Sequence, residues 1–216
     1  MRKIILVQTL LFMVFITANL NAQTTTIADQ KGEKNIQQAL LHPEKVIRLD
    51  LSNQNINKEK IDFSKFINLE YLSIENDHLK EFPKGISSLK KLKTLNLSGN
   101  DFEDLPKNFT NLTALEELFL NNDLNFKFEK NLKTLSKLPS LNSLHLENDE
   151  LNRIPTEIKL LKNLQKLYLS NNQFEKFPLE IEGLNNLKYL DLKNNLIQQK
   201  DRNEILELNF GFQIKL

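Results

Sequence analysis

A sevenfold internal repeat constrains the fold of this 216-residue chain more than any other feature. The units open at Val46, Leu69, Leu92, Leu115, Leu141, Leu164 and Leu187, at intervals of 23, 23, 23, 26, 23 and 23 residues. Each unit reads L-x-x-L-x-L-x-x-N-x-L, as in the run from Leu164 to Phe174, and continues into a second half such as Phe177-Pro178. A period of this length predicts units that stack on their neighbours.

Each unit has a first half that predicts a short strand and a second half that predicts a helical turn. Leucines at the fourth and sixth positions point to one face of the strand, and the residues between them point to the other. Neighbouring strands should form a parallel sheet, because one unit cannot bury its apolar face alone. Proline then ends the strand, and apolar residues three apart fit a short helix. The predicted fold is an α/β solenoid, a horseshoe arc with a concave parallel β-sheet and short convex α- or 3-10 helices.

The repeat divides the chain into four regions. Residues 1–22 are the predicted signal peptide, 23–45 a lead-in with an N-terminal cap helix, 46–199 the repeats and 200–216 a C-terminal cap. The units are 46–68, 69–91, 92–114, 115–140, 141–163, 164–186 and 187–199. The cap helix is predicted over 35–41, before Pro43. At the other end, a helical turn over 202–206 should precede a closing edge strand, predicted from the alternating residues Leu206, Leu208, Phe210, Phe212, Ile214 and Leu216.

The first 22 residues have the order of a secretory signal peptide. Arg2 and Lys3 give a positive start, residues 4–16 are almost entirely apolar, and small and polar residues lead to Ala22. Cleavage after Ala22 is expected, although Leu20 occupies a position where a small residue is preferred. An uncleaved membrane anchor is the alternative, because the apolar run with its flanks approaches the roughly 20 residues that span a bilayer. With cleavage, the mature chain is not inserted in a membrane.

The core should be rich in phenylalanine, because the chain has 14 Phe but no Trp and 3 Tyr. The fourth unit is three residues longer than the others and has Phe126 and Phe128 in place of the proline step. Leu132, Leu135 and Leu138 follow at helical spacing. We therefore predict a longer convex helix in this unit.

The ninth position of each unit predicts a ladder of amides that bond to the backbone of the turns. Its residues are Gln54, Asp77, Asn100, Asp123, Asp149, Asn172 and Asn195. A carboxylate accepts hydrogen bonds but cannot donate, so the three aspartates either lose a donor or hold a proton. Cation binding is the alternative, but Asn100 interrupts the acids and no cluster of ligands is evident. We predict no metal and no cofactor.

Composition and motifs argue against several function classes. The formal net charge is +1, or −1 without Arg2 and Lys3, and such a balance disfavours nucleic-acid binding. The absence of cysteine excludes disulfides, thiolate zinc sites and cysteine nucleophiles. His145 lies two residues from Glu147 on one strand face and could form an acid–base pair with it, but no nucleophile accompanies them. We predict that the protein is not an enzyme, and that His145 and Glu147 form a solvated polar pair.

The third, fifth, seventh and eighth positions should face the concave side, where binding is expected. In the fifth-position column, Phe119, His145 and Tyr168 follow one another on successive strands. Aromatic side chains are enriched among binding hot spots, whereas cross-strand stacking that only stabilises the sheet is the alternative. The predicted ligand-binding residues are Phe119, His145, Tyr168, Tyr71, Glu117, Glu147, Lys166 and Tyr189. Replacing Phe119 and Tyr168 with alanine should abolish binding and leave the melting temperature nearly unchanged.

The repeat units and the lead-in Ile36-Gln-Gln-Ala-Leu-Leu-His-Pro resemble a known family. The chain is similar to leucine-rich-repeat proteins, in particular to the secreted 23-residue repeat proteins of pathogenic spirochaetes. This resemblance implies a bacterial, secreted protein that binds a host or extracellular protein on its concave surface. We expect a monomer that is secreted, periplasmic or on the cell surface and binds one protein ligand. A structural or assembly protein of the cell envelope is the alternative function.

Overall fold

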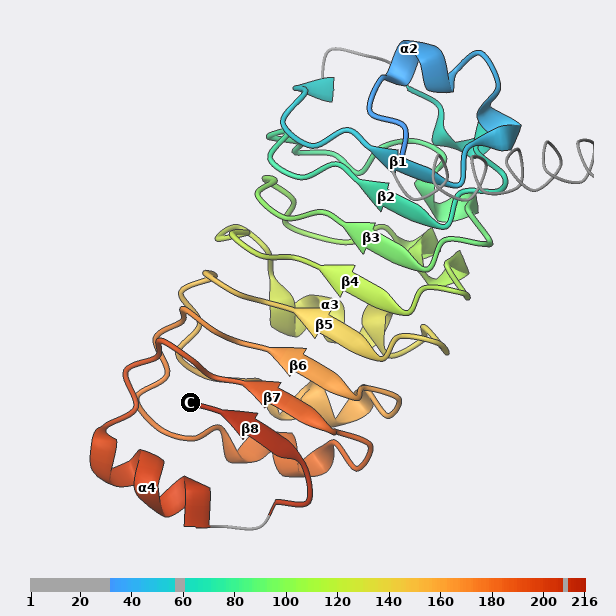
Figure 1. Cartoon of the computed structure of the whole chain (residues 1–216). Coiled ribbons are helices and arrows are strands. Elements are labelled where there is room, and N and C mark those ends of the chain that lie inside the picture. The colour runs from blue at the N-terminus through green and yellow to red at the C-terminus, as the bar shows by residue number, and fades with distance from the viewer. Residues whose placement is uncertain (1–31, 57–60, 208–209) are drawn as a thin grey trace, which may run out of the picture.

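The computed structural model describes residues 32–56, 61–207 and 210–216, and within them one eight-stranded sheet. Every strand pairs in parallel with the next one along the chain, and Figure 1 shows them stacked along one axis. The strands are β1 (Arg48–Asp50), β2 (Tyr71–Ser73), β3 (Thr94–Asn96), β4 (Glu117–Phe119), β5 (Ser143–His145), β6 (Lys166–Tyr168), β7 (Tyr189–Asp191) and β8 (Gln213–Lys215). The predicted solenoid is confirmed. The predicted signal peptide lies outside the described residues.

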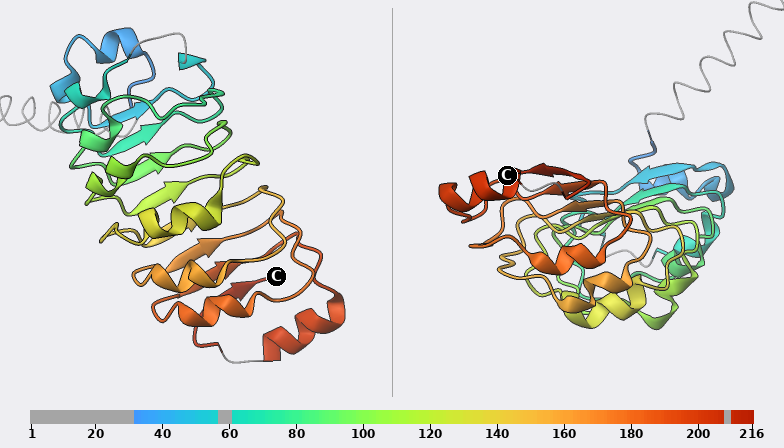
Figure 2. Two further views of the ribbon diagram at one scale, coloured as in Figure 1. Left: turned by 180° about the vertical axis from the view of Figure 1, so that it is seen from behind. Right: turned by 90° about the horizontal axis from the view of Figure 1, so that it is seen from below.

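Short helices lie on the side of the arc opposite the sheet, as the right-hand view of Figure 2 shows. The helices are α2 (Ile36–Ala39), η1 (Pro43–Lys45), η3 (Phe63–Lys65), η4 (Ile86–Ser88), η5 (Lys107–Asn111), α3 (Phe128–Leu135), η6 (Thr156–Leu160), η7 (Leu179–Gly183) and α4 (Gln199–Glu207). The fourth unit has the longer helix that its three additional residues predict, and α3 buries Phe128, Leu132 and Leu135. The first, second, third, fifth and sixth units have 3-10 helices of three to five residues at this place.

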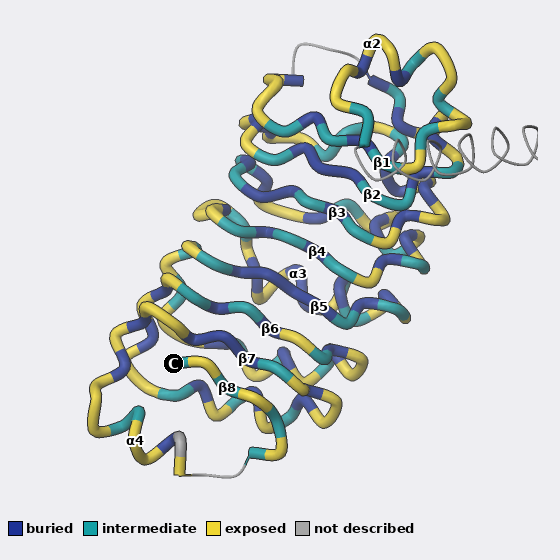
Figure 3. Tube along the Cα trace, viewed as in Figure 1, coloured by how far each residue is buried: buried dark blue, intermediate teal, exposed yellow. Residues whose placement is uncertain are grey.

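The core lies between the sheet and the convex helices. Strand register places the fourth-position leucines side by side, as in the pairs Leu95↔Leu118 and Leu118↔Leu144, and these side chains are fully buried. The predicted phenylalanine-rich core is confirmed, because the largest fully buried side chains are Phe63, Phe66, Phe102, Phe109 and Phe174. Figure 3 shows that the exposed positions concentrate at the loops beside the sheet. The fold therefore keeps the concave strand face rigid.

The eighth position of each unit, which we assigned to the concave face, is the residue at which the chain turns. All seven residues have positive φ values of 54–66° and all are asparagine or glycine: Asn53, Asn76, Gly99, Asn122, Asn148, Asn171 and Asn194. Asparagine tolerates the left-handed region better than most residues with a side chain. The turn therefore selects these two residue types, and the chain leaves the strand in the same direction in every unit.

Gly85 is a position where a side chain should be costly. Its φ is +90°, and a Cβ atom there would collide with the backbone nitrogen of Ser64 in the preceding unit. At Gly99, where φ is +66°, the added Cβ would meet only the side-chain amide of Asn76, which can rotate. We expect Gly85→Ala to lower the free energy of unfolding by about 3 kcal/mol and Gly99→Ala by about 1 kcal/mol. Urea denaturation followed by circular dichroism measures both, and equal losses would contradict the assignment of backbone contact at Gly85.

The N-terminal end of the sheet is covered by the segment before the first repeat. The Asn35 side chain accepts hydrogen bonds from the backbone N–H groups of Gln37 and Gln38 and so caps α2, which buries Ile36 and Ala39. Glu33 bonds to the free edge of β1, because its N–H donates to Arg48 and its carbonyl accepts from Asp50. This pairing removes an open sheet edge.

The C-terminal end differs in part from the prediction. The helix is longer than the predicted turn, since α4 runs from Gln199 to Glu207 and includes Leu206, which we assigned to the edge strand. Leu208 lies outside the described residues. The strand itself is limited to β8, which pairs in parallel with β7 through Ile214↔Leu190. The helix-forming residues of 199–207 override the alternation of apolar residues there.

A search of the described helices finds none that combines the length and apolar character needed to cross a membrane.

Candidate functional site

The candidate site lies on the concave face, where strand register aligns corresponding positions of successive units. In the fifth-position column, the backbone of Phe119 pairs with His145, and His145 pairs with Tyr168. In the third-position column, Lys166 on β6 pairs with Tyr189 on β7. These two columns bring residues that are 23 to 26 positions apart in the chain next to each other.

Four aromatic rings on β4 to β7 form a continuous row, which we call the ring row: Phe119, His145, Tyr168 and Tyr189. The Phe119 and His145 ring centroids are 3.9 Å apart, and those of His145 and Tyr168 are 4.0 Å apart with the planes only 7° from parallel. Tyr189 adds a tilted contact with Tyr168 at 5.3 Å. The predicted adjacency of Phe119, His145 and Tyr168 is therefore observed, and Tyr189 extends it by one strand.

The prediction that all these rings are exposed is wrong for His145. Its residue surface is only 8% exposed, because Phe119 and Tyr168 cover its two faces. Phe119, Tyr168 and Tyr189 are half-buried and keep part of their surface open to the concave side. His145 therefore holds the row together, and its neighbours provide the contact surface.

The edges of the His145 ring face two carboxylates. Its Nε2 atom lies 3.1 Å from Glu117 Oε1, and its Nδ1 atom lies 3.2 Å from Glu147 Oε2. A neutral imidazole can donate a hydrogen bond to only one of them, whereas an imidazolium can donate to both. The prediction of a solvated pair of His145 and Glu147 is thus wrong for the imidazole, which is buried and bridges two partly exposed carboxylates from neighbouring strands. This bridge holds both carboxylates beside the ring row.

This bridge leaves His145 unsuited to acid–base work on a substrate. Both nitrogen atoms are occupied by carboxylates and both ring faces are covered, so a substrate proton has no direct route to the ring. Within the described residues, no group of three His, Asp or Glu side chains is arranged to hold a metal ion. The arrangement is that of a rigid contact surface.

The remaining predicted residues lie at the two sides of the ring row. Tyr71 on β2 is separated from Phe119 by β3, and the Arg48 guanidinium lies 4.0 Å from the Tyr71 ring centroid. Lys166 is exposed beside Tyr168. Tyr71 therefore belongs to a separate pair with Arg48, whereas Lys166, Glu117 and Glu147 border the ring row.

Two residues that the sequence analysis left out also contribute. Lys215 on β8 lies 5.5 Å from the Tyr189 ring centroid, and Asp191 accepts a hydrogen bond of 3.0 Å from the Tyr189 hydroxyl. Lys215 was missed because the run ending in Ile214 and Leu216 was treated as a cap. Those two residues occupy the fourth and sixth positions of a further unit, since Ile214 pairs with Leu190.

The ladder at the ninth position supports the loops beside this face. The Asn100 amide donates hydrogen bonds to the carbonyls of Ile74 and Leu97, and Asn172 does the same to Leu146 and Leu169. The aspartates accept the corresponding bonds from backbone N–H groups but make none through their second oxygen. The Oδ2 atoms of Asp77, Asp123 and Asp149 are buried with no hydrogen-bond partner. Each of the three aspartates therefore lacks the donated bonds of asparagine, as expected of a residue that either loses a donor or holds a proton.

Burial raises the pKa of these carboxyls. Loss of hydration raises the pKa of Asp123 to about 8 and that of Asp149 to about 7, and it also raises the pKa of Asp77. The neighbouring Asp149 charge adds to the effect at Asp123. A neutral carboxyl can donate the bond that a carboxylate cannot, so protonation replaces part of what asparagine supplies elsewhere in the ladder.

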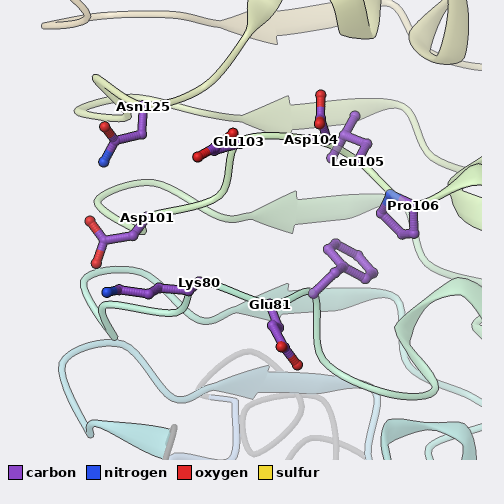
Figure 4. Close-up of a pocket in the computed structure, with 9 residues that line it drawn as sticks. Lys80, Glu81, Asp101, Glu103, Asp104, Leu105, Pro106 and Asn125 are labelled. Carbon is purple, nitrogen blue, oxygen red and sulfur yellow. The ribbon is translucent and has the colours of Figure 1, made fainter.

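An open hollow of about 790 Å³ lies on the loop side of the second to fourth units, away from the ring row (Figure 4). It is lined by Lys80, Glu81, Phe82, Asp101, Glu103, Asp104, Leu105, Pro106 and Asn125. Glu103 and Asp104 form ion pairs with Lys127 and Lys130 of the enlarged fourth unit. These acids are therefore already partnered, and the hollow presents no converging set of reactive groups.

Comparison with known proteins identifies the family. The model of a leucine-rich repeat region matches residues 33–135, and a model of two leucine-rich repeats matches residues 162–202. Comparison with curated protein sequences finds no match.

Solved structures share the fold. A leucine-rich-repeat protein of Leptospira interrogans is 30% identical with a TM-score of 0.50, over 71% of this chain and 44% of that one. Internalin C2 of Listeria monocytogenes is 31% identical with a TM-score of 0.50, over 63% of this chain and 57% of that one. A chain of the Drosophila Toll–Spatzle complex, with 19% identity and a TM-score of 0.53, covers 72% of this chain and 20% of that one. This chain thus spans about half the length of the two bacterial proteins, and it belongs to the leucine-rich-repeat family, with a resemblance to a spirochaete member.

Proposed function

We propose that this protein is an exported interaction module that binds a protein ligand through the ring row on its concave face. Leucine-rich-repeat domains are general protein–protein interaction modules, and solenoids use their concave surfaces in this way. The observation that carries the proposal is the row itself, in which His145 stacks on Phe119 and Tyr168, and Tyr168 contacts Tyr189. Aromatic side chains that are held in place before binding lose little entropy on contact.

The carboxylates support a binding role for the same surface. Glu117 and Glu147 flank the rings at the border with solvent, as polar side chains surround the apolar centre of many protein interfaces. The proposed ligand is a host or other extracellular protein, as the resemblance to secreted spirochaete proteins implies. We infer an interaction module without catalytic activity, because both nitrogens of His145 face carboxylates and both faces of its ring are covered.

A pull-down with the mature chain tests the proposed function. We expect it to retain a specific protein from extracellular or host material. A variant in which Phe119 and Tyr168 are both replaced by alanine should retain less of that protein than the wild-type chain. Retention from envelope extracts alone would instead favour the alternative function in envelope structure or assembly. Equal retention by the wild-type chain and the variant would contradict a site at the ring row.

Export is tested separately. The positive start, apolar run and Ala22 support removal of the first 22 residues during secretion. N-terminal sequencing of material from culture supernatant or from the cell surface should begin at Gln23. A mature protein that begins at Met1 would refute the cleavage, and material found only inside the cell would refute export.

A further inference from the structure

From β2 to β8 the charges on the concave face are segregated along the solenoid, whereas β1 carries both Arg48 and Asp50. At the third, fifth and seventh positions of the units that contain β2 to β5, the acidic side chains are Glu75, Glu117 and Glu147, and the sequence places no lysine or arginine at these positions. From β6 to β8 the same positions carry Lys166, Lys193 and Lys215. The ring row crosses the boundary between these halves, because Phe119 and His145 lie on one side and Tyr168 and Tyr189 on the other.

Asp191, the one acid in the basic half, is turned away from solvent. It is only 9% exposed and accepts hydrogen bonds of 3.0 Å from the Tyr189 hydroxyl and from the Lys193 backbone N–H group. Lys166, Lys193 and Lys215 are all exposed. The accessible charge of this half is therefore positive.

The charges of each half are not paired with opposite fixed charges. Glu75 accepts a hydrogen bond of 2.9 Å from the Asn96 amide, and Glu117 and Glu147 contact only His145 among titratable groups. In the part of the chain that the structure describes, Lys166 and Lys193 form no ion pair. The face therefore presents a negative and a positive end to a partner, which favours one orientation over its reverse.

We propose that the ligand docks as an extended segment along the solenoid axis, with basic side chains over β2–β5 and acidic side chains over β6–β8. This inference rests on the proposed function, since it assigns the chemistry of the partner of that same surface. Neighbouring strands are about 4.8 Å apart, so the centres of the two halves are separated by roughly 17 Å. An extended chain rises about 3.4 Å per residue, and basic and acidic groups of the ligand should lie about five residues apart.

A second copy of this chain fits the surface poorly. Its face would be complementary in charge when turned around, but two concave sheets cannot approach each other over their centres. A separate protein segment is the occupant that satisfies both the charge and the curvature.

Selection from a displayed library of random 12-residue peptides tests the inference on the mature chain. We expect the enriched peptides to carry Lys or Arg about five residues from Asp or Glu, with apolar or aromatic residues between them. The binding of a selected peptide should weaken about tenfold in Glu75→Lys and in Lys166→Glu, and it should weaken as salt increases. The convex substitution Glu157→Lys is the matched control, because it changes the charge equally and leaves the concave face intact, and its affinity should be unchanged.

A charge exchange adds a readout that unfolding cannot mimic. The double variant Glu75→Lys with Lys166→Glu reduces the charge difference between the two halves, so it should discriminate less than the wild-type chain between a selected peptide and the same peptide with its basic and acidic residues interchanged. Peptides that require Phe119 and Tyr168 but ignore both charge variants would overturn this inference and leave the proposed function standing. Peptides unaffected by alanine at Phe119 and Tyr168 would refute the ring row as the site. A library without binders, or a dimer in solution that Glu75→Lys disrupts, would overturn the extended segment as the occupant.

Discussion

Replacing both Asp123 and Asp149 with asparagine should make the protein several kcal/mol more stable at pH 9 and should remove most of the pH dependence of its unfolding. In the wild-type chain the pKa values of about 8 and about 7 lie above the ordinary value of 3.8. Between about pH 4 and about pH 8, the folded chain holds protons that the unfolded chain has released. The stabilisation is therefore complete below about pH 4 and is lost as the pH rises through about 7 and 8.

The difference in stability between the asparagine variant and wild type should grow from about pH 4 to about pH 8 and should be constant above that range. An amide carries no charge to desolvate, and its Nδ2 group can donate to turn carbonyls as Asn100 does to Ile74 and Leu97. At pH 5 the folded carboxyls hold their protons and the unfolded chain has only begun to gain from releasing them, so the difference in stability between the two proteins should be much smaller than at pH 9. Each ionising group changes the free energy of unfolding by at most about 1.4 kcal/mol per pH unit.

Thermal and urea unfolding between pH 5 and pH 9, followed by circular dichroism, measure this difference. Asp62→Asn is the control, because hydrogen bonds from Ser64 lower the pKa of Asp62 and its effect falls in the acid range below about pH 4. It should leave the slope between pH 5 and pH 9 unchanged. A wild-type melting temperature that is constant over this range, or an equal slope in the double variant, would show that the buried aspartates are not protonated.

The fold could be predicted because the residues that specify it recur at a fixed interval. Leu95, Leu118 and Leu144 had to align once the repeat was recognised, and the structure places them side by side. The three additional residues of the fourth unit were likewise expected in the convex helix, and α3 there buries Phe128 and Leu132. In a solenoid, the repeat spacing in the sequence therefore gives the register of neighbouring strands in the structure.

The candidate site could be predicted only in part. Register places Phe119, His145 and Tyr168 in one column, but it does not give the side-chain torsion angles that stack the rings and bury His145. The contact of His145 Nε2 with Glu117 depends on diagonal geometry across two strands. Such details follow from packing, which periodicity does not describe.

The ends of the solenoid were the least predictable part. Local alternation placed Leu206 in a strand, whereas it lies in α4. A terminal segment packs against only one neighbouring repeat unit. Its local helix propensity therefore has more influence on its structure than in the middle of the solenoid. The asparagine and glycine residues at the eighth positions were visible in the sequence, and their tolerance of positive φ could have identified the turn.

Replacing Phe119 and Tyr168 together with alanine should weaken binding of the protein ligand roughly 100-fold or more. Hot-spot side chains contribute about 2 kcal/mol or more each, and both rings lie at the centre of the row. The structure changes the expectation of an unaltered melting temperature. Because both rings stack on His145, their loss removes two aromatic contacts and should cost about 1–3 kcal/mol of stability.

Two further variants separate lost contact from lost stability. Phe177→Ala removes a half-buried ring on the loop side, whose centroid lies 4.8 Å from that of the Phe210 ring. This variant should destabilise the fold and leave binding unchanged. Phe119→Leu with Tyr168→Leu keeps apolar volume on the strands while removing the planar surface. This second variant should retain more stability than the alanine variant and still bind weakly.

The ring row is tested most directly by the equilibrium dissociation constant of the ligand retained in the pull-down. Calorimetry at one temperature measures this constant for the alanine variant and for Phe177→Ala. We predict that the constant rises roughly 100-fold or more for the alanine variant and stays at the wild-type value for Phe177→Ala. A constant for the alanine variant within about threefold of wild type would contradict the account and leave the row as a device that only stabilises the sheet.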